Sequence, residues 1–176
     1  MRYLLIVLMM LAFITIGCDK NTTESNNNSD DIMEHSTINV KTATEYFNFN
    51  INSGSVDAAT AYDIIFYSVM ESPAPGAPQI SFPRFRAKDD LSIAVIKETI
   101  LENITEIPAN NEFTLNYSTE NDDWFHMTDA NIVLSNESVW VVNTTDGKFP
   151  AFEIINYYDE QGNSGVFTIN WKYLSE

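Results

Sequence analysis

The last third of the chain constrains the fold more than any other segment. It contains three β-type runs separated by two short turns, and these runs cover residues 138–144, 148–158 and 166–173. The first turn contains Asp146-Gly147, a pair that favours a tight hairpin because both turn positions favour positive φ. In the last run, Phe167, Ile169 and Trp171 alternate with polar residues, as expected for a strand with one buried face. The pattern predicts three consecutive antiparallel strands.

The middle of the chain is also rich in residues that favour strands. The whole sequence has 11 Phe, 8 Tyr and 3 Trp, and aromatic residues are enriched in strands. Phe47, Phe49 and Ile51 alternate on one face of a predicted half-buried strand, and residues 61–69 form a second, strongly apolar one. The proline-rich segment 72–78 interrupts regular structure. We therefore predict an all-β domain with mostly antiparallel, sandwich-like sheets.

One segment departs from this β pattern. Residues 91–97 are typical of a strand, but Ile100, Ile104 and Ile107 then recur at helical spacing. Pro108 ends the pattern because proline is poorly tolerated inside a helix. We predict one short helical turn near residues 98–106.

Cys18, the only cysteine, ends an apolar run that begins after Arg2. A stretch this short does not span a hydrocarbon core, which needs about 20 apolar residues, and it suits the apolar region of a secretory signal. Gly17-Cys18 resembles a lipobox, with Thr15 where leucine is usual. We predict a lipoprotein signal peptide over residues 1–17 and acylation of Cys18, for example with palmitate. The alternatives are a single membrane-spanning helix and a secreted protein with a free thiol.

Residues 18–37 are polar and acidic and have little to bury, so they are predicted to form a disordered tether. Their acids are either a sorting signal for surface display or simply a solvated segment. The folded domain is predicted to cover residues 38–176. His35 falls in the predicted tether and is expected to be solvated.

The charge of the chain excludes several partners. The formal charge is −16, which argues against nucleic acid and against adhesion to anionic headgroups. Attachment to a membrane is therefore expected through the lipid anchor alone.

No catalytic motif is present. The sequence lacks a phosphate-binding glycine loop, a His-Glu-x-x-His zinc motif and a Gly-x-Ser-x-Gly elbow. Acylation of Cys18 would remove the only thiolate, and with it thiolate metal sites and cysteine nucleophiles. With 25 Asp and Glu, carboxylate pairs are expected by chance. We predict that the protein is not an enzyme.

Several segments, taken together in order, resemble the HmuY family of haem-binding bacterial lipoproteins. The upstream strand Tyr62-Asp63-Ile64-Ile65-Phe66 resembles a family strand that begins with tryptophan. The other matching segments are Ile104–Pro108, Trp124-Phe125, Val139–Lys148, Phe152–Tyr158 and Gly165–Tyr173. The resemblance covers most of the chain from about Ile38 to Tyr173.

This resemblance implies an all-β protein that captures haem outside the cell and passes it to a TonB-dependent outer-membrane receptor. It implies an outer-membrane lipoprotein at the cell surface. It further implies that haem iron is held by two axial side chains, either a histidine pair or methionines.

The candidate axial ligands are His126, Met127 and Met70, because haem iron takes imidazole or thioether ligands. Trp124 and Phe125 are candidate walls of the haem pocket, and no metal site other than the haem iron is predicted. Each candidate ligand also has an ordinary structural explanation. His126 would be a strand-end histidine bonded to nearby aspartates or solvent, and the methionines would fill gaps in the core.

Two other functions remain open. The aromatic residues Trp124, Tyr157 and Tyr158, which are expected to be exposed, would suit a surface β-sandwich module that binds glycan or protein without haem. A structural lipoprotein subunit of an envelope complex is the other alternative.

Overall fold

The computed structural model describes residues 31–58, 61–119, 124–128, 131–134 and 137–175. The predicted signal peptide 1–17 and the predicted lipidation site Cys18 lie outside the described residues. None of the helices within the described part is long and apolar enough to cross a membrane.

The described chain forms three sheets in which every strand pair is antiparallel. The largest sheet has the order β1-β12-β11-β10-β6-β7, with strands β1 (Met33–Ser36), β6 (Ser92–Lys97), β7 (Thr114–Leu115), β10 (Ser138–Asn143), β11 (Phe149–Tyr158) and β12 (Ser164–Leu174). The second has the order β3-β2-β4-β5, with strands β2 (Glu45–Asn48), β3 (Ser53–Ser55), β4 (Ile64–Glu71) and β5 (Ile80–Ala87). The third pairs β8 (Phe125–Thr128) with β9 (Asn131–Leu134). The predicted all-β fold is confirmed.

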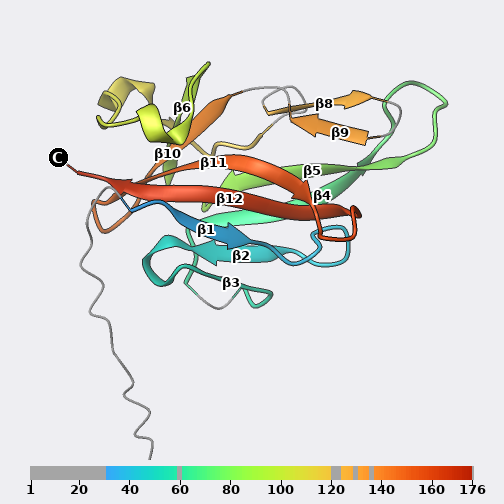
Figure 1. The fold of residues 1–176 in the computed structure, drawn as a ribbon, viewed down its shortest axis with the longest axis horizontal. Coiled ribbons are helices and arrows are strands. Elements are labelled where there is room, and N and C mark those ends of the chain that lie inside the picture. Colours follow the sequence, from blue (N-terminus) through green and yellow to red (C-terminus); the bar gives the residue numbers. More distant parts are fainter. Residues whose placement is uncertain (1–30, 59–60, 120–123, 129–130, 135–136, 176) are drawn as a thin grey trace, which may run out of the picture.

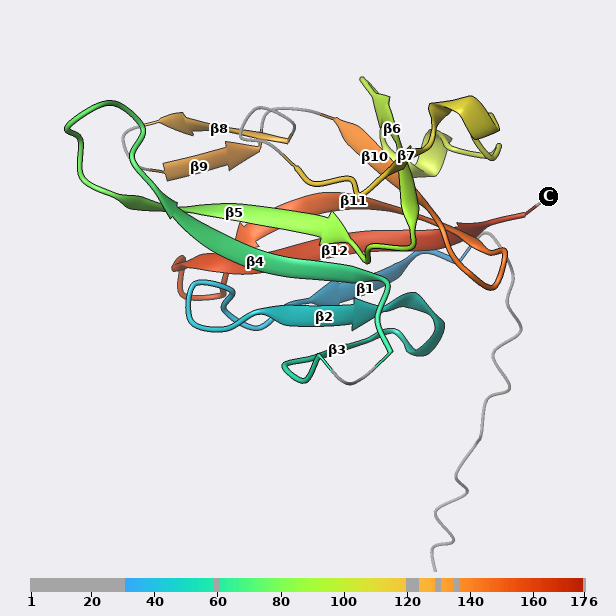
Figure 2. The same ribbon diagram turned by 180° about the vertical axis from the view of Figure 1, so that it is seen from behind.

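The core lies between the two larger sheets, which pack face to face (Figures 1 and 2). Aromatic rings meet across this interface: Phe66 lies 5.0 Å from Phe167, and Phe85 lies 5.2 Å from Phe152 between ring centroids. The predicted alternation in β12 is confirmed, because Phe167, Ile169 and Trp171 are all buried in this core. The strand buries one face because successive side chains point to opposite sides of a sheet.

The predicted β10–β11 hairpin is present, but its turn differs from the expected one. Of the two central residues only Gly147 has a positive φ, at 76°. The Gly147 N–H donates to the carbonyl oxygen of Thr144 (3.1 Å), and the Thr144 hydroxyl accepts from the Lys148 N–H (3.1 Å). These bonds close a loop between Thr144 and Lys148 that is longer than a two-residue turn. Gly147, the residue with left-handed backbone conformation, is the last residue of this loop.

The predicted helical turn is confirmed as the 3-10 helix η2 (Leu101–Asn103). Leu101 is fully buried in a smaller apolar cluster on the outer face of the large sheet. Two further 3-10 turns, η1 (Phe49–Ile51) and η3 (Asn110–Glu112), were not predicted.

The predicted strand through Ile51 ends three residues early, at Asn48. The Asn48 side chain accepts a hydrogen bond from the Asn50 N–H (2.9 Å) and thereby starts η1. Side-chain bonds of this kind compete with the sheet ladder. Ile51 is consequently 65% exposed rather than sharing a buried face with Phe47.

The predicted boundary at Ile38 is corrected by the position of β1. Residues Met33–Ser36 pair with β12, and His35 lies opposite Ile169. The His35 imidazole donates from Nε2 to Glu45 Oε1 (2.6 Å), and its ring lies 4.4 Å from the Phe47 ring. Glu45 is 3% exposed and also accepts from the Ile38 N–H (2.6 Å). The expectation that His35 is solvated is therefore wrong: a buried carboxylate needs partners, and His35 supplies one.

We predict that His35→Ala lowers the free energy of unfolding by about 1–3 kcal/mol, because it leaves the buried Glu45 carboxylate short of a partner. Urea denaturation at neutral pH measures the change. His126→Ala is the matched control, since His126 is exposed and its loss should change stability by less than about 0.5 kcal/mol. Equal effects of the two substitutions would contradict the role assigned to His35.

Candidate functional site

A cleft of about 280 Å³ lies where the ends of several strands meet. The β8–β9 hairpin lies beside the connected ends of β4 and β5 in both views (Figures 1 and 2). We name this hollow the methionine cleft, and it is lined by Lys41, Met70, Gln79, Ile80, Ser81, Met127, Ile132 and Ser164.

The structure brings two of the three candidate axial ligands to this cleft. Met70 lies near the end of β4, opposite Ser81 on β5, and is 59% exposed. Met127 lies on β8, is half-buried and packs against the main core. The two thioethers are 57 positions apart in the sequence, so only the placement of the β8–β9 hairpin brings them to one hollow.

His126 does not line the methionine cleft. It precedes Met127 on β8, and successive side chains on a strand point to opposite faces. His126 is accordingly exposed whereas Met127 is half-buried. The β8–β9 hairpin therefore places the Met127 thioether, but not the His126 imidazole, at the methionine cleft.

The two candidate pocket aromatics belong to the core. Trp124 and Phe125 are each 1% exposed, and neither lines the methionine cleft. The Trp124 ring lies 5.2 Å from Phe167 and 5.8 Å from Tyr157 between centroids. Both side chains are therefore part of the core and do not form a wall of the cleft.

The aromatic surface expected for a glycan-binding module is not formed. Trp124 and Tyr157 are buried, and Tyr158 is only partly exposed. Burial raises the pKa of the Tyr157 phenol above its usual range, so this side chain stays neutral. Because two of the three rings are buried, these residues do not form an exposed aromatic surface for stacking on a sugar.

Tyr158 has a different role, which sequence reasoning missed. Its hydroxyl donates to the carbonyl oxygen of Ile132 (2.8 Å) and accepts from the Ile132 N–H (2.9 Å). These bonds hold β9 against β11 and place the Ile132 side chain at the methionine cleft. The only sequence signal was a tyrosine at the end of a long strand, which does not identify its partner.

Lys41 also lines the cleft and was not predicted. Its ammonium donates to the Ser164 hydroxyl (2.6 Å), which lies at the start of β12. A cation beside two thioethers gives the cleft both soft donors and a site for an anionic group.

No protein-family model and no curated protein matches this sequence. Solved structures do resemble it. The apo HmuY analog of Tannerella forsythia is 14% identical with a TM-score of 0.52, over 83% of this chain and 98% of that one. Apo PinO from Porphyromonas gingivitis is 11% identical with a TM-score of 0.53, over 82% of this chain and 98% of that one. A candidate lipoprotein from Bacteroides fragilis is 12% identical with a TM-score of 0.50, over 85% of this chain and 92% of that one.

The chain therefore has a HmuY-like fold. The resemblance seen in the sequence motifs is supported by a likeness that extends over nearly the whole length of each of these structures. At this level of identity the likeness concerns the fold, and the side chains at the site must be judged on their own chemistry.

We predict that Trp124→Ala lowers the free energy of unfolding by about 3–5 kcal/mol, because it opens a cavity in the core. Met70→Ala should cost less than about 1 kcal/mol, since Met70 is mostly exposed. Urea denaturation of both variants measures this difference. A small effect of Trp124→Ala would show that the ring is not part of the core.

Proposed function

We propose that this protein is a lipid-anchored haem-binding protein that captures haem outside the cell and hands it to an outer-membrane transporter. The main support for the proposal is that Met70 and Met127 line the same cleft on a HmuY-like fold. The protein would act by capture and release, without enzymatic chemistry.

The residues of the methionine cleft fit haem in three respects. The thioether sulfurs of Met70 and Met127 are axial ligands of the kind that haem iron accepts. Ile80 and Ile132 supply apolar contact for the macrocycle. Lys41 supplies a cation for a propionate group.

The size of the cleft sets the manner of binding. Its volume of about 280 Å³ lies just below the ~300–1,000 Å³ usual for small-molecule pockets. Part of the macrocycle would therefore remain outside the cleft, or the β8–β9 hairpin would move aside. Partial exposure suits a carrier, because a receptor must reach the cargo in order to take it.

The same proposal places the protein at the outer membrane, facing the cell exterior. Its supports are the lipobox-like sequence at Cys18, the acidic segment that follows it and the formal charge of −16. A strongly acidic domain is repelled by anionic headgroups, so the anchor would hold the chain while the domain remains available to a TonB-dependent receptor.

Titration of the detergent-purified full chain with haemin tests the proposal. Met70→Ala and Met127→Ala should each weaken binding and alter the Soret band, because each removes one axial sulfur. The double variant should lose the shifted band, while His126→Ala should bind haemin as the parent does.

The outcomes separate the binding claim from the ligand assignment. A parent protein that leaves the haemin spectrum unchanged contradicts haem binding itself. A spectrum altered by His126→Ala and unaffected by the methionine substitutions would retain haem binding but overturn the choice of cleft.

A further inference from the structure

A second and larger cavity, of about 420 Å³, is lined by residues at the end of β9, at the start of β10 and in β11. We name it the acidic cavity. Its apolar lining comes from Ile100, Leu134, Ile154 and Ile155, and its polar lining comes from Glu137, Ser138 and Glu153.

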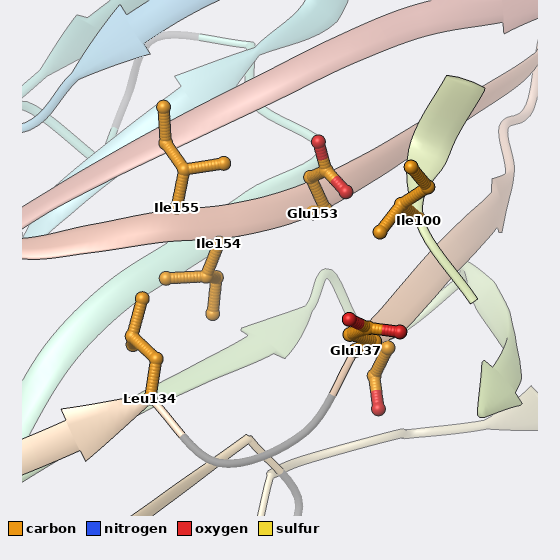
Figure 3. Close-up of a pocket in the computed structure, with 7 residues that line it drawn as sticks. Ile100, Leu134, Glu137, Glu153, Ile154 and Ile155 are labelled. Atoms are coloured by element: carbon orange, nitrogen blue, oxygen red, sulfur yellow. The ribbon is translucent and has the colours of Figure 1, made fainter. Parts of the chain in front are cut away.

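The acidic cavity has a polar end and an apolar end. The side chains of Glu137 and Glu153 lie at one end, near Ile100, whereas Leu134, Ile154 and Ile155 lie at the other (Figure 3). Leu134 and Ile155 are 38% and 40% exposed, so the apolar end presents uncovered aliphatic surface. The two ends differ in chemistry, which predicts a ligand with two different ends.

Hydrogen bonds from backbone N–H groups fix the Glu153 carboxylate and the backbone of Glu137. The Leu101 N–H donates to Glu153 Oε2 (2.9 Å), and the Thr99 N–H donates to the carbonyl oxygen of Glu137 (3.0 Å). Ile100 is thus held between two anchored neighbours. Because η2 is attached to β10 and β11 in this way, the cavity is formed before any ligand arrives.

An irregularity in β11 shapes the apolar end. The register of β11 against β12 shifts between Ile154 and Asn156. Asn156 Oδ1 accepts from the N–H groups of Tyr157 (2.9 Å) and Tyr158 (3.1 Å), which stabilises the distortion. Bulges redirect side chains and occur near binding sites, and here Ile154 and Ile155 both line the cavity.

Within the described part of the chain, no ion pair compensates the charge of the cavity. Within the described residues, the ion pairs involve neither Glu137 nor Glu153. Lys97 lies opposite Ser138 in the β6–β10 register but does not line the cavity. Glu153 is half-buried, so its carboxylate is partly removed from water and attracts a cation more strongly than a surface carboxylate does.

We propose that the acidic cavity binds a small organic cation with an ammonium head and an aliphatic body. The head lies between Glu137 and Glu153, and the body covers Leu134, Ile154 and Ile155. A volume of about 420 Å³ is within the usual range of about 300–1,000 Å³ for small-molecule sites.

Other occupants fit less well. Haem is unsuited because its propionates would face two carboxylates and the lining offers neither sulfur nor imidazole. A metal ion is unsuited because no group of three or more His, Cys, Asp or Glu side chains suitable for a metal occurs among the described residues. The proposal does not depend on haem binding at the methionine cleft.

Three probes of equal chain length test the proposal: hexylammonium, hexanol and hexanoate. The full chain in detergent, labelled at isoleucine methyl groups, is titrated by NMR against a micelle blank. Hexylammonium should shift the methyl signals of Ile100, Ile154 and Ile155 in a saturable manner. Hexanol and hexanoate should bind at least tenfold more weakly, since neither places a positive charge between the carboxylates.

Glu137→Gln and Glu153→Gln should each weaken hexylammonium binding at least threefold, and Glu160→Gln, at an exposed residue of the β11–β12 turn, should leave it unchanged. Glutamine at position 153 retains an oxygen that accepts from Leu101, and unshifted methyl signals in the free variant show that the cavity is intact. If Glu153→Gln impairs folding, the effect of Glu137→Gln on hexylammonium binding alone tests the proposal. Equal binding of the three probes, no saturable shift, or no effect of Glu137→Gln would overturn the proposal.

Discussion

The contact between aromatic rings of the two larger sheets is the interaction on which the rest of the structure depends. Phe85 is central to it, with ring centroids 5.1 Å from Trp140 and 5.2 Å from Phe152. Such pairs contribute about 0.5–1.5 kcal/mol each beyond simple burial. With a single cysteine in the chain, no internal disulfide supplements this core. Both hollows lie at the margins of the core, where strand ends and turns replace continuous packing.

The sequence predicted the regular part of this fold well, because each prediction depended on local periodicity. The alternation of Phe167, Ile169 and Trp171 requires only one buried face, and β12 has one. Prediction failed where a side-chain hydrogen bond determined the backbone conformation. Asn48 is the example, since its side chain caps η1 and β2 ends there. It also failed at β1, whose four residues are stabilised by a partner strand more than 130 positions away. A short polar segment carries no local sign of such a partner.

The candidate site was predictable by residue type but not by arrangement. Met70 and Met127 were identified from their chemistry, and the structure places both at one cleft. His126 was favoured for the same reason, yet strand alternation directs it away from Met127. Trp124 was assigned to a pocket wall because it is a large aromatic near a candidate ligand, but a large ring is equally suited to a core. Spacing along the chain does not distinguish these two environments, whereas the fold does.

The position of β1 has a mechanical consequence. β1 is the edge strand of the large sheet and the first element after residues 18–30, which connect it to the predicted anchor. Any tension between a membrane and the domain would therefore act first on the β1–β12 ladder, before it reaches the aromatic core. The His35–Glu45 hydrogen bond connects this edge strand to β2 of the other sheet, and it would share that load between the two layers. Detachment of these four edge residues would lengthen the connection to the predicted anchor, and neither hollow is lined by a residue of β1.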